Sequence, residues 1–130
     1  MTAVKKRRVM IVDDEPLTAE ILRCALEDRG YDVTVRHEAL GTSAAVIRDQ
    51  PDVVVIDIEM PAIKGNDVAR LLANNKALTR TSFILHSSRA AAELEVAARE
   101  CGAIGAITKS TGLAAFLSEF ERLMRGRFVP

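Results

Sequence analysis

The chain has 130 residues, of which 48% are hydrophobic, and this is long enough for one domain with its own core. Its 18 basic and 18 acidic residues balance to a formal net charge of zero, so charge gives no general attraction to nucleic acid or to an anionic membrane. No apolar run approaches the length of a membrane span, and the N-terminal Lys5–Arg8 run is followed by too few apolar residues for a secretory signal.

The first half of the chain alternates between strand-like and helix-like segments. An apolar run at Val9–Val12 predicts a strand, and Tyr31–Arg36 alternates polar and apolar residues as an edge strand does. Ala39–Asp49 predicts a second helix, and Pro51 separates this helix from the third strand, predicted at Asp52–Asp57. Between the first two strands, a helix opened by Pro16 and closed by Gly30 has an apolar face at Leu17, Ile21, Leu22, Ala25 and Leu26.

The second half continues the alternation to the end of the chain. Gly65 opens a helix that carries Val68, Leu71 and Leu72. A strand at Phe83–Ser87, an alanine-rich helix at Ala90–Cys101 and a strand at Ala103–Lys109 follow. The last helix has a regular apolar stripe at Leu113, Phe116, Leu117, Phe120, Leu123 and Met124.

These elements predict one α/β domain that covers residues 1–130, with loose termini at about 1–6 and 126–130. Strands that are almost wholly apolar are covered on both faces, and alternating strands and helices give a parallel sheet with right-handed crossovers. Five such units predict the flavodoxin-like, doubly wound order 2-1-3-4-5. In that order Cys24 and Cys101 lie across the sheet from one another, so we expect no disulfide.

Polar residues follow the predicted strands at the point where each strand ends. Asp13 and Asp14 follow the first strand, Asp57 ends the third, Ser87 ends the fourth and Lys109 ends the fifth. Ligands of open α/β sheets bind outside this edge, so we expect the side chains to converge there. Carboxylates are ligands that suit Mg²⁺, and a carboxylate can also form an acyl phosphate. We therefore expect Mg²⁺ beside a nucleophilic Asp57, with Ser87 and Lys109 contacting a phosphoryl group.

With these residues in this order, the chain resembles the receiver domain of two-component response regulators, of the chemotaxis-regulator type. The matching positions are Asp13 and Asp14, Asp57, Met60-Pro61 with Gly65, Ser87 and Lys109. The resemblance covers nearly the whole chain. It implies that a sensor histidine kinase or a histidine phosphotransfer protein passes a phosphoryl group to Asp57.

The resemblance further implies Mg²⁺ held by Asp13, Asp14, Asp57 and the backbone carbonyl of Glu59. It implies a cytoplasmic protein that catalyses only its own phosphorylation and slow dephosphorylation. A downstream protein would bind the face formed by the fourth helix, the fifth strand and the last helix. Direct contacts with nucleic acid or a membrane are not expected.

The chain departs from this family at positions that matter for switching. Ala106 stands where an aromatic ring usually moves inward with the hydroxyl residue, and Ser110 stands where a proline preceded by a cis peptide usually aims the lysine. A cis bond before a non-proline residue costs roughly 3–4 kcal/mol, so it would need enforcement by its surroundings. Glu59 and Arg89 flank the phosphoryl position, either as an ion pair or as two independent solvated charges.

Two other functions compete with a phosphorylated switch. A phosphorylation-independent interaction module is favoured by Ala106 and disfavoured by the complete acidic set with Lys109. A small Mg²⁺-dependent phosphatase with an aspartyl nucleophile is disfavoured because such enzymes usually carry Asp-x-Asp after the first strand. His86 is expected to point away from Ser87, because neighbours on a strand alternate sides, and to be either packed or half-exposed.

Overall fold

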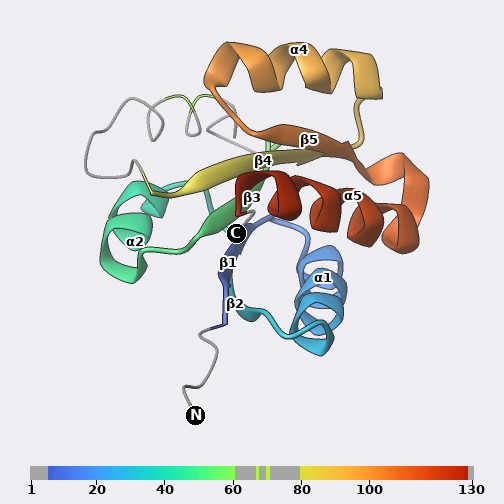
Figure 1. Cartoon of the computed structure of the whole chain (residues 1–130). Helices are drawn as coiled ribbons and strands as arrows, with labels where there is room; N and C mark the ends of the chain where they lie inside the picture. The colour runs from blue at the N-terminus through green and yellow to red at the C-terminus, as the bar shows by residue number, and fades with distance from the viewer. Residues whose placement is uncertain (1–5, 61–66, 68–69, 71–79, 129–130) are drawn as a thin grey trace.

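A computed structural model describes residues 6–60, 67, 70 and 80–128 of the chain (Figure 1). Its centre is a five-stranded sheet in the order β2-β1-β3-β4-β5, and every neighbouring pair is parallel. The strand order predicted from the sequence is confirmed. The strands are β1 (Arg8–Val12), β2 (Asp32–Arg36), β3 (Val53–Asp57), β4 (Ser82–Ser87) and β5 (Gly105–Thr108).

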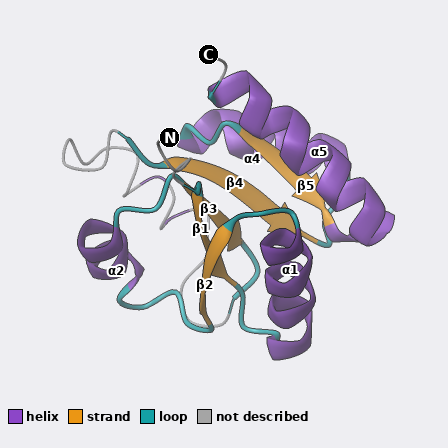
Figure 2. Cartoon of the chain, turned by 60° about the horizontal axis from the view of Figure 1, so that its bottom comes forward, coloured by secondary structure: helices purple, strands orange, loops and turns teal. Residues whose placement is uncertain are grey.

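Helices cover both faces of the sheet (Figure 2). One face carries α1 and α5, and the other carries α2 and α4. The helix expected from Gly65 lies outside the described residues. Among the described helices, none is long and apolar enough to cross a membrane. The helices are α1 (Pro16–Asp28), α2 (Thr42–Asp49), α4 (Ala91–Cys101) and α5 (Gly112–Arg127), with a short 3₁₀ turn, η2 (Lys109–Thr111), before α5.

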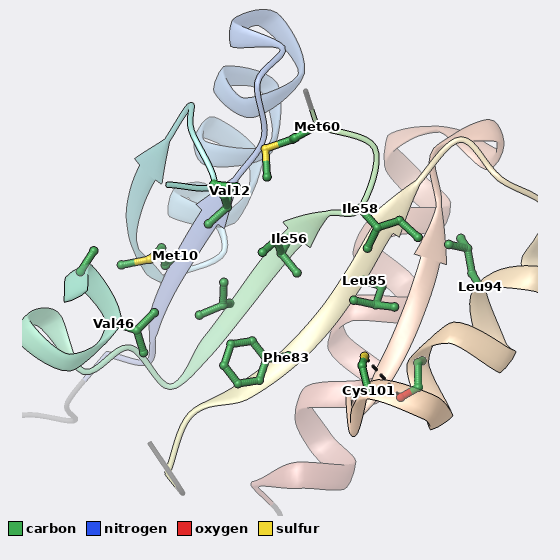
Figure 3. Close-up of a cluster of buried hydrophobic side chains, with 14 residues drawn as sticks. Met10, Val12, Val46, Ile56, Ile58, Met60, Phe83, Leu85, Leu94 and Cys101 are labelled. Carbon is green, nitrogen blue, oxygen red and sulfur yellow. Dashed lines mark hydrogen bonds between the residues drawn. The ribbon is translucent and has the colours of Figure 1, made fainter. Parts of the chain in front are cut away.

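The core consists of two apolar layers, one on each face of the sheet. Figure 3 shows the layer under α2 and α4, where Val46 and Leu94 pack against strand residues such as Ile56 and Leu85. The layer under α1 and α5 is built around Phe116 and other buried apolar side chains. Successive strand residues alternate between the layers, which explains why β1, β3 and β4 are apolar almost throughout.

The two cysteines belong to different environments. Cys101 is buried in the layer under α4, where its thiol donates to the carbonyl oxygen of Ala98 at 3.6 Å (Figure 3). Cys24 is exposed on α1, on the other face of the sheet, and both cysteines are free. The expectation that they do not pair is therefore confirmed.

The apolar face predicted for α1 is only partly correct. The residues that face the sheet are Ala19, Leu22 and Leu26. Leu17 is 73% exposed and Ile21 is 45% exposed, whereas Ala19 is fully buried, so the buried face of α1 is rotated from the predicted one. Ile21 instead borders a hollow between α1 and α5.

Several element boundaries also differ from the sequence prediction, three of them for reasons or with consequences that can be named. α2 begins at Thr42 rather than Ala39, because Gly41 precedes it with a left-handed φ of 85°. β5 ends at Thr108, and Lys109 opens the 3₁₀ turn instead of ending the strand. α5 continues to Arg127, into the stretch that was expected to be loose.

Candidate functional site

The polar residues singled out from the sequence converge at the carboxyl edge of the sheet. Asp57 ends β3 and Ser87 ends β4, while Asp13 directly follows β1 and Lys109 directly follows β5. The register brings these ends level, since Val12 pairs with Ile56 and Ser87 pairs with Thr108. Parallel strands therefore deliver all of these side chains to one edge.

Three carboxylates meet at this edge. One oxygen each from Asp13, Asp14 and Asp57 lies within 4.8 Å of the other two. Asp13 is 1% exposed and Asp57 is 3% exposed, so neither is well hydrated. Burial is the main reason that the pKa of Asp13 is raised above its usual value, although a hydrogen bond from the backbone of Glu15 and the charge of Lys109 act to lower it.

Local turns fix the two buried carboxylates in the same way. The backbone N–H of Glu15 donates to Asp13 Oδ1 at 2.9 Å, and the backbone N–H of Glu59 donates to Asp57 Oδ1 at 2.8 Å. Each aspartate thus binds the residue two positions ahead of it, as in an Asx turn. The Oδ2 atoms of both residues remain available to the centre of the site.

Lys109 provides the positive charge of the site. Its Nζ lies 3.0 Å from Asp13 Oδ2, 3.1 Å from Asp57 Oδ2 and 3.3 Å from Glu15 Oε1. Burial acts to lower the pKa of Lys109, but its close contacts with the negative carboxylates of Asp13 and Asp57 outweigh burial and raise the pKa above the ordinary value. The ammonium therefore stays charged and draws two buried carboxylates together.

One ammonium does not satisfy this group of acids. Among the described residues, the buried Oδ2 atom of Asp13 has no hydrogen-bond partner, although Lys109 Nζ lies nearby. Buried carboxylates are costly unless enough positive charge and donors reach them, and here one ammonium is shared by Asp13, Asp57 and Glu15. Three carboxylates with hard oxygen atoms, one of them unsatisfied, fit the ligand preferences of Mg²⁺.

Ser87 is fully buried beside the acidic group. Its Oγ accepts a hydrogen bond from the backbone N–H of Arg89 at 3.2 Å, a bond that does not use the hydroxyl proton. His86, the preceding residue, points to the opposite face and packs against Phe116 with ring centres 5.1 Å apart. Its expected orientation is confirmed, and burial, helped by the charge of Lys109, lowers the pKa of His86 to about 3.

An ion pair spans the outer side of the site. Arg89 Nε donates to Glu59 Oε1 at 3.1 Å, and Ser88 Oγ donates to Glu59 Oε2 at 3.0 Å. Of the two arrangements considered for Glu59 and Arg89, the ion pair is the one present. The hydrogen bond from Ser88 is the main reason that the pKa of Glu59 is lowered, and Arg89 adds to it.

The structure shows how the chain is arranged at the two positions that depart from the family pattern, Ser110 and Ala106. The peptide between Lys109 and Ser110 is trans, so Lys109 reaches the site without a cis bond. Ala106 packs against the apolar layer under α4 and is partly buried. Glu15 and Thr108 also contact the site, and neither was singled out from the sequence. The only signal for Glu15 was its place directly after two aspartates, and an isolated threonine gives none.

Comparison with known proteins gives a consistent result. The family model for the response regulator receiver domain matches residues 9–121. The chain is 35% identical over 116 residues to a protein-glutamate methylesterase/protein-glutamine glutaminase of Myxococcus xanthus, covering 88% of this chain and 33% of that protein. It is 31% identical over 118 residues to the probable transcriptional regulatory protein TcrX of Mycobacterium tuberculosis, covering 90% of this chain and 49% of that protein.

Solved structures share the same fold. The chemotaxis response regulator CheY4 of Vibrio cholerae superposes with a TM-score of 0.83 at 20% identity, covering 92% of this chain and 99% of that one. A two-component response regulator of the LuxR family from Aurantimonas sp. gives a TM-score of 0.83 at 27% identity, covering 95% and 88%. The chain spans between a third and a half of the length of those two curated relatives. The chain belongs to the response regulator receiver domain family of two-component signalling.

Proposed function

We propose that this receiver domain accepts a phosphoryl group on Asp57 from a sensor histidine kinase or a histidine phosphotransfer protein. The observation that carries the proposal is the buried carboxylate of Asp57, with Lys109 Nζ 3.1 Å from its Oδ2 and the carboxylates of Asp13 and Asp14 beside it. A nucleophile, a fixed cation and a group of acidic ligands are the parts that phosphoryl transfer to a carboxylate requires.

The roles of the residues follow from the chemistry of the transfer. A carboxylate oxygen of Asp57 attacks phosphorus, the new O–P bond forms, and the P–N bond of the phosphohistidine breaks, with the electron pair staying on the imidazole nitrogen. Lys109 then exchanges its contact with Asp57 for a phosphoryl oxygen, and Ser87 donates its hydroxyl proton to another. Asp13, Asp14 and Asp57, with the backbone carbonyl of Glu59 that the family resemblance adds, would hold Mg²⁺, which would supply positive charge at the carboxylates and phosphoryl oxygens.

The output is a change in a surface that a partner reads. If the Ser87 hydroxyl shifts toward the phosphoryl group to donate its proton, it pulls on the backbone N–H of Arg89, which donates to the same hydroxyl oxygen. The segment that moves leads directly into α4, so we infer that the downstream partner binds the face formed by α4, β5 and α5. The protein acts as a switch rather than as an enzyme on other substrates, and the acyl phosphate is lost slowly by hydrolysis at the same site.

One observation favours a second function, an interaction module that works without phosphorylation. Ala106 lies on β5 facing α4 and has no ring that could change position. A domain with this residue has lost one of the usual routes by which a phosphoryl group alters the binding face. In that case the acidic group and Lys109 would have only a structural role.

Exposure to a small phosphodonor separates the two functions. The protein is incubated with acetyl phosphate, with and without Mg²⁺, and its intact mass is measured. We expect one phosphoryl group to be added, only when Mg²⁺ is present, and none to be added to Asp57→Asn. Asp32→Asn serves as the matched control, because Asp32 is an exposed aspartate at the start of β2, away from the carboxyl edge. Absence of uptake by the wild-type protein would favour the interaction module.

A further inference from the structure

The hydroxyl group of Thr108 makes three contacts at the end of β5. Thr108 Oγ1 donates to the backbone carbonyl of Arg89 at 2.9 Å. It accepts from the backbone N–H of Ser110 at 3.3 Å and lies 3.0 Å from Ser110 Oγ. A hydroxyl has one proton to donate and two lone pairs to accept with, so these contacts use its full capacity.

These contacts join the residues before and after Lys109 in the chain, Thr108 and Ser110, to one another. Thr108 is the N-cap of the 3₁₀ turn Lys109–Thr111, with an extended backbone, and its side chain binds the N–H at the second position of that turn. Lys109 occupies the first position, between the cap and the capped group. The direction in which the Lys109 side chain leaves the backbone is therefore set by a turn that the Thr108 hydroxyl closes.

The same hydroxyl ties this turn to the loop that leaves β4. Ser87 and Thr108 are register partners on neighbouring strands, and both bind the backbone of Arg89. Ser87 Oγ accepts from its N–H at 3.2 Å, while Thr108 Oγ1 donates to its carbonyl at 2.9 Å. The Arg89 peptide units thus join the hydroxyl and the ammonium of the site through a short chain of hydrogen bonds.

We propose that Thr108 is a positioning residue for phosphoryl transfer: its hydroxyl clamps the Lys109 turn to the loop at Arg89 and so aims the ammonium at Asp57. Lysine has a long, flexible side chain. The peptide after Lys109 is an ordinary trans peptide, so other contacts must fix the direction of the Lys109 side chain. Its Nζ nevertheless lies within 3.3 Å of three carboxylates, those of Asp13 and Glu15 in the loop after β1 and that of Asp57 at the end of β3. This inference rests on the proposed function, because it assigns a role in that transfer.

The first test compares Thr108→Val, which keeps the branched shape and removes the hydroxyl, with Thr108→Ser, which keeps the hydroxyl. We expect Thr108→Val to label with acetyl phosphate about fivefold more slowly, as loss of one net hydrogen bond would produce, and Thr108→Ser to restore the wild-type rate. Mg²⁺ affinity, measured by titration calorimetry, should be unchanged because no carboxylate is altered. Thr81→Val is the matched control, since its hydroxyl donates to the carbonyl of Pro51 at 2.8 Å, away from the site.

A double-mutant cycle with Lys109→Ala separates positioning from a merely structural role. If Thr108 acts through Lys109, Thr108→Val has no further effect on the labelling rate once the ammonium is gone. An equal slowing in both backgrounds, or a wild-type rate for Thr108→Val, would overturn the inference while leaving the phosphorylation of Asp57 intact. Failure of the wild-type protein itself to label would overturn the proposed function. If Thr108→Val does not fold, Thr108→Ala against Thr108→Ser makes the same comparison.

Discussion

The ammonium of Lys109 lies 3.1 Å from Oδ2 of Asp57, although the two residues are separated by 52 positions in the chain. The contact exists because β3 and β5 end at the same edge of the sheet, with β4 between them. It means that, without a phosphoryl group, the proposed acceptor is already held by the cation that would later bind the transferred group. The predictions below concern the residues around this contact.

Replacing Asp13 by Asn should separate metal binding from folding. Burial raises the pKa of Asp13, and the one ammonium near its Oδ2, that of Lys109, is shared with Asp57 and Glu15, so the charge of Asp13 is only partly compensated without a second cation. We expect Asp13→Asn without Mg²⁺ to melt at the wild-type Tm or a few degrees above it, and to lose most of the rise in Tm that Mg²⁺ gives the wild-type protein. Asp14→Asn should show the same loss of the Mg²⁺ effect.

Thermal melts with and without Mg²⁺ check this prediction, and labelling of either variant at low Mg²⁺ should be slower than that of the wild-type protein. The exposed Asp32→Asn serves as the control and should keep the full Mg²⁺ effect. An equal rise in Tm with Mg²⁺ in Asp13→Asn and in the wild-type protein would show that Asp13 is not a ligand.

The ion pair between Arg89 and Glu59 should affect the acyl phosphate more than the fold. The two side chains are 37% and 39% exposed, and a pair of this kind contributes under about 1 kcal/mol to stability. We expect Arg89→Gln to melt close to the wild-type Tm and to lose its phosphoryl group a few times faster, because the outer side of the site becomes more open to water. Arg48→Gln, which breaks an exposed pair with Asp49 on α2, is the control for both measurements. An unchanged lifetime of the phosphorylated form would argue against this role of the pair.

His86 should make the protein less stable in acid. Burial lowers its pKa from 6.5 to about 3, so between these values the unfolded chain binds a proton that the folded chain does not. The free energy of unfolding should therefore fall as the pH drops from 6.5 towards 3. In His86→Leu this part of the pH dependence should disappear.

Chemical denaturation across this pH range measures the effect. If His86→Leu and the wild-type protein lost stability in parallel, another group would be responsible for the acid sensitivity.

Ala106 leads to a prediction about where the domain responds to phosphorylation. A two-state equilibrium moves only by the difference in stabilisation that the phosphoryl group gives to the two states, and a methyl group offers no ring to bind in the second state. We expect a beryllofluoride mimic to change amide exchange and NMR shifts mainly at Ser88–Ala91 and at the start of α4, with little change around Ala106. A large response centred on Ala106 and α5, with the β4–α4 loop silent, would contradict this route.

Much of the site could be predicted because a simple rule relates strand ends to space. Parallel strands end at one edge, so the convergence of Asp57, Ser87 and Lys109 follows once the apolar runs are recognised as strands. The direction of His86, away from Ser87, followed in the same way from the alternation of side chains along β4, whereas its burial against Phe116 did not.

Other features depend on packing that a sequence pattern does not encode. Leu17 and Ile21 have the spacing of core residues, yet α1 buries Ala19, Leu22 and Leu26 and leaves those two side chains exposed. The role of Thr108 depends on the carbonyl of Arg89, which is 19 positions away and belongs to a loop. Contacts between elements, rather than local periodicity, decide which side chains are buried and which contacts such residues make.

The most direct test of the account is to locate the phosphoryl group within the chain. The protein is labelled with acetyl phosphate and Mg²⁺, the acyl phosphate is reduced with borohydride to leave a stable mark, and the marked peptide is sequenced by mass spectrometry. We predict a single mark at Asp57, absent when Mg²⁺ is withheld. A mark at Asp13 or Asp14, or no mark on a folded protein, would contradict the assignment of Asp57 as the phosphoryl acceptor.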